Sequence, residues 1–274
     1  MPAGPGSKPA KPPRTARDPI DRRHAWLTEK FARYSTRMVR RRFHGVRYLT
    51  DGHARIAPQD VAVPSAVMLN HPSWWDPLSA VVASRAFFPN HVVFAPIDAA
   101  MLAAYPLLDR FGFFGVDQGS PRGAAQFLRT SGRILDDPRR MLWLTAQGRF
   151  ADARTRPIGL MPGLAHLSRR VPGLRVYPLA LEYPMWDQSK PELLMHLAPP
   201  IEPPGDASST EAWSAALEAG LTRAMDRLAD AAQARDPGRF TALNAGRSGV
   251  GGAYDAWRRL TSWARGKKFQ ADHG

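Results

Sequence analysis

The chain has 274 residues, of which 44% are hydrophobic, a formal net charge of +14 and no cysteine. This length and composition are typical of one large globular domain, or two small ones, with a substantial core. The absence of cysteine excludes a disulfide scaffold, thiol catalysis and a cysteine-ligated zinc site. The sequence has no apolar run of the ~18 residues typical of a membrane-spanning helix and no apolar stretch near its start that indicates a secretory signal. We therefore expect a cytoplasmic protein.

The positive charge is concentrated at the two ends of the chain. Residues 1–50 carry a net charge of +10 and residues 253–274 carry +3, which leaves +1 for the residues between them. A nearly neutral body with basic ends suits contact with a polyanionic surface. Nucleic acid and anionic lipid are both surfaces of this kind.

The basic N-terminal region divides into two segments. Residues 1–19 are rich in proline, alanine and lysine and are predicted to be a disordered lead-in. Residues 20–50 are predicted to be a basic amphipathic helical segment, because apolar side chains recur there at helical spacing. The apolar stripe consists of Leu27, Phe31, Tyr34 and Met38. The adjoining face holds Arg22, Arg23, Lys30, Arg33, Arg37, Arg40 and Arg41.

Two placements of this helical segment are open. In the first, the apolar stripe packs on the rest of the protein and the arginines face water. In the second, the stripe lies in the headgroup region of a membrane while the arginines bind anionic lipid. Both placements can apply at once, one to one part of the helix and the other to another part.

Residues 51–240 are predicted to form the main domain, in which short β-rich runs alternate with helical ones. The expected strands are Ser65–Asn70, His91–Ala95, Arg140–Thr145, Leu174–Glu182 and Glu192–Ala198. The expected helices are Asp76–Phe87, Arg122–Leu135, Met161–Arg170 and Ser209–Ala234. Such alternation predicts an α/β fold with a mainly parallel sheet flanked by helices. Residues 241–274 are predicted to be a glycine-rich link followed by a basic amphipathic tail.

The strongest chemical signal is the segment Asn70-His71-Pro72-Ser73-Trp74-Trp75-Asp76-Pro77. It follows an apolar run, and ligand sites in open α/β sheets gather where strands end. Asp76 is expected at the cap position of the next helix, with Pro77 at its first helical position, so that the short loop brings the carboxylate to the imidazole. The carboxylate would fix the tautomer of His71, leaving the other ring nitrogen to accept a proton. A turn histidine bonded to local backbone and a plain helix cap are the alternatives.

This segment resembles the first signature of the glycerolipid acyltransferases, the lysophosphatidate acyltransferase family, in which Asn-His, four residues and Asp follow an apolar strand. Three later blocks follow in the family's order. They are Gly115-Val116-Asp117-Gln118, then Leu142-Trp143-Leu144-Thr145-Ala146-Gln147-Gly148-Arg149-Phe150, then Val176-Tyr177-Pro178-Leu179-Ala180-Leu181. The resemblance covers roughly residues 61–201. It implies His71 and Asp76 as catalytic residues, and Asp117, Gln118, Gln147, Gly148 and Arg149 as substrate-binding residues.

The acceptor-binding blocks depart from the family pattern, which places an arginine in the second block and Pro-Glu-Gly-Thr-Arg in the third. Gln118 stands in place of the second-block arginine, and Gln147 in place of the glutamate. Arg149 and Phe150 occupy the threonine and arginine positions. A glutamine keeps hydrogen-bonding capacity but loses the charge and the bidentate geometry of a guanidinium. The cations that could compensate are Arg122, Arg149, Arg154 and Arg156.

The resemblance implies an O-acyltransferase of glycerolipid metabolism that moves a fatty acyl group from acyl-CoA or an acyl carrier protein to a lysophospholipid hydroxyl. No bound cofactor and no metal are expected. We expect an anionic membrane surface as a partner, no nucleic acid, and a peripheral location on the inner face of the membrane. Because the phosphate ligands differ, a glycosylated or other non-phosphate lipid hydroxyl is the alternative acceptor. A non-catalytic basic protein that binds membrane or nucleic acid is the alternative function.

Overall fold

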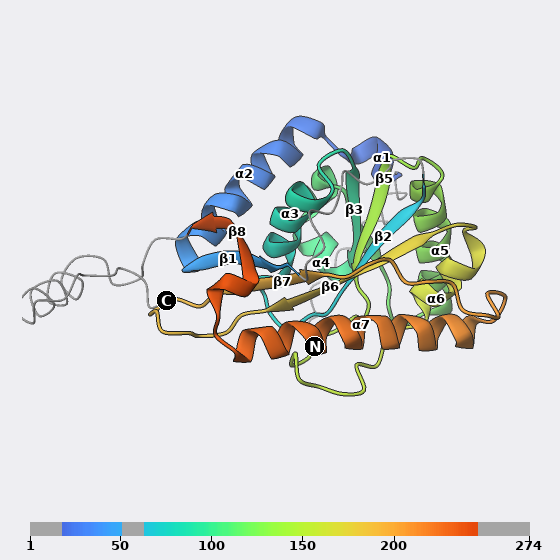
Figure 1. The fold of residues 1–274 in the computed structure, drawn as a ribbon. Helices are drawn as coiled ribbons and strands as arrows, with labels where there is room; N and C mark the ends of the chain where they lie inside the picture. Colours follow the sequence, from blue (N-terminus) through green and yellow to red (C-terminus); the bar gives the residue numbers. More distant parts are fainter. Residues whose placement is uncertain (1–17, 51–62, 246–274) are drawn as a thin grey trace, which may run out of the picture.

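The computed structural model describes residues 18–50 and 63–245, whose strands form one eight-stranded sheet in the order β4-β3-β5-β2-β6-β7-β1-β8 (Figure 1). The strands are β1 (Gly45–Leu49), β2 (Ser65–Leu69), β3 (Val92–Asp98), β4 (Phe113–Val116), β5 (Arg140–Thr145), β6 (Arg175–Glu182), β7 (Leu193–Leu197) and β8 (Phe240–Ala245). The α-helices are α1 (Pro19–Arg22), α2 (Ala25–Arg42), α3 (Asp76–Phe87), α4 (Ala99–Ala104), α5 (Pro121–Leu135), α6 (Gly163–Arg170) and α7 (Thr210–Gln233). Two short 3-10 helices are η1 (Pro106–Phe111) and η2 (Pro237–Arg239).

The sheet is mainly parallel, which confirms the predicted fold class. Strands β4, β3, β5, β2 and β6 run in one direction. Strand β7 pairs antiparallel with β6 and parallel with β1, and β8 is antiparallel to β1. In the centre, Leu69 at the end of β2 is level with Thr145 of β5 and Leu179 of β6. The carboxyl ends of three parallel strands therefore meet at one edge.

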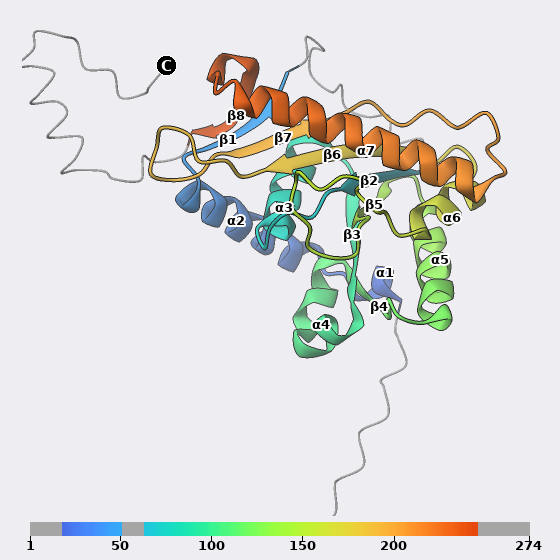
Figure 2. The same ribbon diagram turned by 90° about the horizontal axis from the view of Figure 1, so that it is seen from below.

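Helices cover both faces of the sheet, so its central strands are buried on both sides. Helices α5, α6 and α7 lie on one face, and α2 and α3 lie on the other (Figures 1 and 2). Strand β2 alternates between the two cores: Ala66 and Met68 belong to the first, Val67 and Leu69 to the second. A strand buried on both faces reads as a continuous apolar run, which is why the strand is evident in the sequence.

The predicted helical segment 20–50 differs from the structure in two places. Residues Gly45–Leu49 form strand β1 rather than helix, and the chain is extended at Arg23 and His24, which separates α1 from α2. Arg22 and Arg23 consequently do not share the basic face of α2. Arg22 forms an ion pair with Asp109, whereas Arg23 lies over the Phe94 ring, where burial lowers the pKa of its guanidinium.

The buried face of α2 is offset from the predicted apolar stripe, of which Leu27, Phe31 and Met38 are only half-buried. The Phe31 ring stacks on Phe111 of η1 with centroids 4.5 Å apart, and the buried face of the helix carries Ala32, Ser35 and Val39. Tyr34 is exposed. The first of the two placements therefore describes most of this helix, and the arginine face points away from the core.

The outer segments of the domain prediction lie only partly within the described residues. Of the predicted lead-in 1–19, residues 1–17 lie outside them, while Asp18 caps α1. Residues 241–245 belong to β8 rather than to a link, and the predicted tail from residue 246 onward lies outside the described residues. In the part of the chain that the structure describes, no helix is long and apolar enough to cross a membrane.

Candidate active site

Asn70 fixes the point where β2 ends and the loop that carries His71 begins. Its side chain is buried and bridges to β6: Nδ2 donates to the Leu181 carbonyl oxygen (3.0 Å), and Oδ1 accepts from the Leu181 amide (2.8 Å). Both polar ends of the amide are thus satisfied by one residue of the neighbouring strand. A buried side chain held in this way positions the next residue, His71, at the carboxyl edge of the sheet.

His71 and Asp76 are in direct contact, as their spacing predicts. His71 Nδ1 lies 2.6 Å from Asp76 Oδ2. An ionised carboxylate can only accept a hydrogen bond, so Nδ1 carries the proton and Nε2 presents a lone pair. The Asp76 side chain is 1% exposed and that of His71 is 16% exposed. Nε2 has no hydrogen-bond partner among the described residues and is not sealed from solvent. This geometry suits a general base.

Further donors complete the surroundings of the Asp76 carboxylate. The Ser73 amide donates to Oδ2 (3.0 Å), and the Tyr183 hydroxyl donates to Oδ1 (2.6 Å) while lying 3.1 Å from the Ser79 hydroxyl. Burial, and then the charge of Asp76, raise the pKa of Tyr183 well above its ordinary value. Tyr183 therefore stays protonated and remains a donor. The sequence analysis did not predict a role for Tyr183. The usable signal was a polar residue that directly follows a buried strand, here β6.

The start of α3 differs by one residue from the expectation. Asp76 is the first residue of the helix and Pro77 the second; the cap position belongs to Trp75, which makes no side-chain cap bond. The Asp76 carboxylate is held by His71, Ser73 and Tyr183 and is not used to cap the helix. Its role as a plain cap is therefore excluded.

Gln147 follows β5 and lies directly beside His71. Its buried Oε1 accepts from the His71 backbone amide (2.9 Å), and its Nε2 donates to the Ile158 carbonyl oxygen (3.3 Å). The Ala151 amide in turn donates to the His71 carbonyl oxygen (3.0 Å). Both amide atoms of Gln147 are thus engaged with backbone, and the loop after β5 is tied to both sides of the His71 peptide.

Phe150 covers one face of the imidazole. Its ring stacks on His71 with centroids 4.1 Å apart and an interplanar angle of 29°, while the side chain remains 61% exposed. The side chain that stands at the family's arginine position is therefore an apolar neighbour of the base. Sequence reasoning placed Phe150 in the block but did not anticipate this contact.

The second and third blocks come together around Gly148. Gly148 has φ +64°, and a Cβ there would lie 2.3 Å from the Met161 sulfur and 3.5 Å from Gln118 Oε1. Gln118 therefore borders the same part of the site. Asp117 is turned toward its own loop, where its carboxylate accepts from the Ser120 hydroxyl (2.7 Å).

The four arginines that could replace the missing phosphate ligands differ in availability. Arg154 is paired with Asp152 (2.7 Å), and Arg156 binds Asp226 (Nε–Oδ1 3.2 Å) and two backbone carbonyl groups. Arg149 and Arg122 form no ion pair with any residue in the ranges 18–50 and 63–245. Of the four, these two remain available to an acceptor.

Exposed apolar side chains gather around this edge of the sheet. Trp74, which is 68% exposed, belongs to the loop that carries His71, while Met161 and Met185 follow β5 and β6. A further group lies beyond the end of β3, where α4 projects from the sheet (Figure 2); it consists of Met101, Tyr105 and Leu107.

Replacing Tyr183 with phenylalanine tests its role as a positioning residue. We expect kcat to fall about tenfold, the equivalent of one hydrogen bond to a charged group, while the KM of both substrates stays within twofold. Steady-state kinetics on the folded variant check this. Tyr48→Phe is the control, since the Tyr48 hydroxyl bonds no described residue. A rise in KM with unchanged kcat would assign Tyr183 to substrate binding instead.

Comparison with known proteins adds a fold relative. No protein-family model matches the chain, and no curated protein matches it. Among solved structures, the chain is similar to the 1-acyl-sn-glycerophosphate (LPA) acyltransferase PlsC from Thermotoga maritima, with a TM-score of 0.51 and 13% sequence identity. The match covers 74% of this chain and 80% of that chain. At this identity, the likeness shows a shared fold.

Proposed function

We propose that the protein transfers a fatty acyl group from a thioester to a hydroxyl group of a lipid. The contact between His71 and Asp76, with Nε2 left accessible at the carboxyl edge of the sheet, carries the proposal. The shared fold with an LPA acyltransferase supports the same reaction class. The donor is acyl-CoA or an acyl carrier protein, and the reaction requires no bound cofactor.

The proposed reaction uses the pair as a base and its electrostatic support. Nε2 of His71 takes the proton of the acceptor hydroxyl as its oxygen attacks the thioester carbonyl carbon. Asp76 stabilises the resulting imidazolium. Collapse of the tetrahedral intermediate breaks the carbon–sulfur bond, and the imidazolium returns its proton to the leaving thiolate. The proton and the acyl group are thus exchanged among the acceptor hydroxyl, the thioester and His71, with no further reactant.

The residues at the family's acceptor-binding positions favour a lipid hydroxyl that is distant from any phosphate monoester. Such a phosphate carries up to two negative charges, and burying them without paired cations is costly. Gln147 is neutral and bonded to backbone, and Phe150 is apolar. We therefore propose a neutral or glycosylated lipid hydroxyl, or a phosphodiester whose charge lies further from the base.

The surroundings of the site suit an acceptor drawn from a membrane. Exposed tryptophan, phenylalanine and methionine side chains around His71 can enter the headgroup boundary and offer an apolar path to the base. The exposed Trp26, with the Lys30 ammonium 5.2 Å from the centre of its ring, offers an aromatic and a cationic contact to anionic lipid. We propose a peripheral protein on the inner, cytoplasmic face of the membrane, with no nucleic-acid partner.

A side-by-side assay with one acyl donor tests the acceptor. We expect kcat/KM for glycosylated or zwitterionic lysolipids to exceed that for lysophosphatidate by about tenfold or more, the effect of one missing charge-assisted contact. Arg149→Ala should change this ratio little. Arg154→Ala is its control, because Arg154 is already paired with Asp152. If lysophosphatidate is the best acceptor and Arg149→Ala alone destroys that preference, a rearranged phosphate clamp replaces the proposed neutral site.

A further inference from the structure

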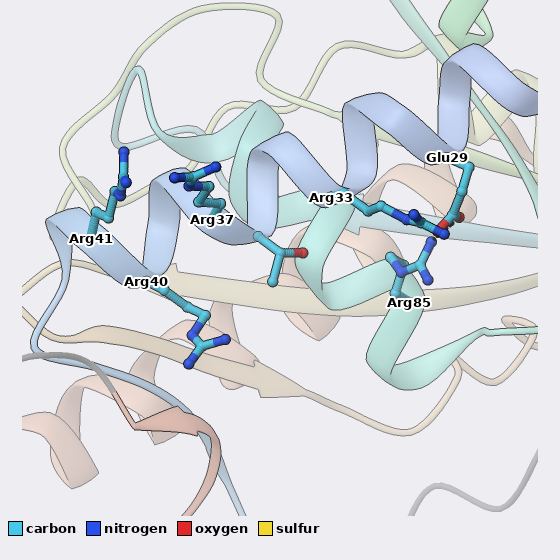
Figure 3. Close-up of a pocket in the computed structure, with 7 residues that line it drawn as sticks. Glu29, Arg33, Arg37, Arg40, Arg41 and Arg85 are labelled. Carbon is cyan, nitrogen blue, oxygen red and sulfur yellow. Dashed lines mark hydrogen bonds and ion pairs between the residues drawn. The ribbon is translucent and has the colours of Figure 1, made fainter.

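An open, strongly basic pocket lies between helices α2 and α3 and is not used by the proposed reaction. Its volume is about 690 Å³. The lining side chains are Glu29, Arg33, Thr36, Arg37, Arg40 and Arg41 of α2 and Arg85 of α3 (Figure 3). We call it the arginine pocket. Its five arginines and one glutamate give a net charge of +4, and its volume lies within the range of small-ligand sites.

The single acid compensates only one end of the pocket. Glu29 binds Arg33 (3.0 Å) and Arg85 (2.5 Å). Arg37, Arg40 and Arg41 form no ion pair with any residue that the structure describes. Figure 3 shows Arg37, Arg40 and Arg41 grouped along α2 at the end away from Glu29. Three positive charges are therefore available there to a ligand.

Helix stability alone does not account for this grouping. Arg40 and Arg41 lie in the last turn of α2, where a cation interacts favourably with the helix dipole. Arg37 lies more than one turn from the end and is three and four residues from them, a spacing at which like charges repel and destabilise a helix. An anion in the arginine pocket would turn this repulsion into attraction.

The free end of the arginine pocket adjoins the candidate active site. Phe43, the residue after α2, packs its ring on Trp75 (centroids 5.2 Å apart) and on Tyr183 (5.6 Å). Trp75 precedes Asp76, and Tyr183 donates to Asp76. Phe43, which is buried, therefore connects the end of α2 to two direct neighbours of Asp76.

We propose that the arginine pocket binds the phosphates of the nucleotide carrier in an acyl-coenzyme A donor, an inference that rests on the proposed acyl transfer. The 3′-phosphate and the diphosphate of that carrier together hold about four negative charges, which match the net charge of the pocket. The flexible arm that ends in the thioester would then lead past Phe43 and Trp75 toward His71. A recess between two helices suits a compact phosphate group better than a flat headgroup layer.

A calorimetric titration with coenzyme A tests the proposal without requiring turnover. We expect Arg37→Gln/Arg40→Gln to weaken binding at least about tenfold, and dephospho-coenzyme A, which lacks the 3′-phosphate, to bind the wild type several-fold more weakly than coenzyme A. The control Arg42→Gln/Arg129→Gln removes the same charge from exposed positions outside the pocket and should stay within twofold. In steady-state kinetics, the pocket variant Arg37→Gln/Arg40→Gln should have a higher KM for acyl-coenzyme A than the wild type, with kcat and the KM for the acceptor unchanged. Arg37→Lys, which keeps the charge, should restore part of the binding if Arg37→Gln impairs folding.

Failure of coenzyme A binding by the arginine pocket can be distinguished from failure of the proposed acyl transfer. Equal binding of coenzyme A by the pocket and control variants would overturn the inference, as would transfer only from an acyl carrier protein with no coenzyme A binding. Loss of binding to phosphatidylglycerol vesicles by the pocket variant, with coenzyme A binding intact, would assign the arginines to lipid headgroups and overturn it too. Pocket-dependent binding of coenzyme A without acyl transfer to any lipid would support the arginine pocket and refute the proposed function.

Discussion

Replacing His71 with alanine is expected to lower kcat for acyl transfer by about 10²–10⁴-fold, the contribution of a positioned general base. Among the residues that the structure describes, the His71 imidazole is the group that combines a fixed protonated Nδ1 with an accessible Nε2 at this edge of the sheet. Initial rates with a thioester donor measure the loss. The fold should survive, because the backbone of His71 is held by Gln147 and Ala151 rather than by its own side chain.

His166→Ala is the matched control for this experiment. His166 lies on α6 beside Thr210 and has no contact with Asp76. We expect it to retain the rate of the wild type. A His71→Ala protein that unfolds at the wild-type temperature and still transfers acyl groups at a near wild-type rate would refute the base mechanism.

Replacing Asp76 with asparagine is expected to lower kcat by about 10–10²-fold, the equivalent of losing the charge from one hydrogen bond to a charged group. The structure indicates how asparagine would sit. Its carbonyl oxygen can still accept from His71 and Ser73, while its amide faces Tyr183, whose hydroxyl can turn to accept. The tautomer of His71 would be preserved and only the negative charge lost. The variant therefore measures how much the charge stabilises the imidazolium.

Comparing Asp76→Ala with Asp76→Asn separates the effect of the carboxylate charge from the effect of the hydrogen bonds that position His71. Asp76→Ala removes both, and it leaves the Tyr183 hydroxyl only the Ser79 hydroxyl, at 3.1 Å, as an acceptor, so we expect a lower rate than for Asp76→Asn and a lower midpoint of thermal unfolding. Rates and unfolding midpoints of the two variants are to be compared in the same buffer. An Asp76→Asn rate within tenfold of the wild type would show that the charge contributes little.

The central elements could be predicted from the sequence because they are buried on both faces or amphipathic over several turns. Strand β5 and helix α3 have the predicted bounds, and β2 is one residue shorter. Strands β1, β4 and β8 were missed, since each lies at or near an edge of the sheet and follows a segment with helical or linker character. The parallel sheet follows from the alternation of elements, whereas the antiparallel placement of β7 does not.

The candidate site was predictable only where its contacts are local. His71 and Asp76 are five residues apart, so one loop brings them together and the spacing reveals it. Tyr183 lies 107 residues from Asp76, and Gln147 lies 76 residues from His71. Such contacts depend on which strands are neighbours and in what register. The resemblance pointed to Gln147 as a ligand of the acceptor, but it could not show that the amide is engaged by backbone.

The stacked ring of Phe150 lies beside the line along which a reactant reaches the proposed base. A hydroxyl group has to approach Nε2 along the plane of the imidazole, because the lone pair lies in that plane, and Phe150 covers one face of the ring at 4.1 Å. A water molecule must use the same line of approach. In the proposed reaction, a bound lipid hydroxyl on that line would keep water from being activated. Whether the thioester is used for acyl transfer or lost to hydrolysis would then depend on whether a lipid hydroxyl or a water molecule lies on this line to Nε2.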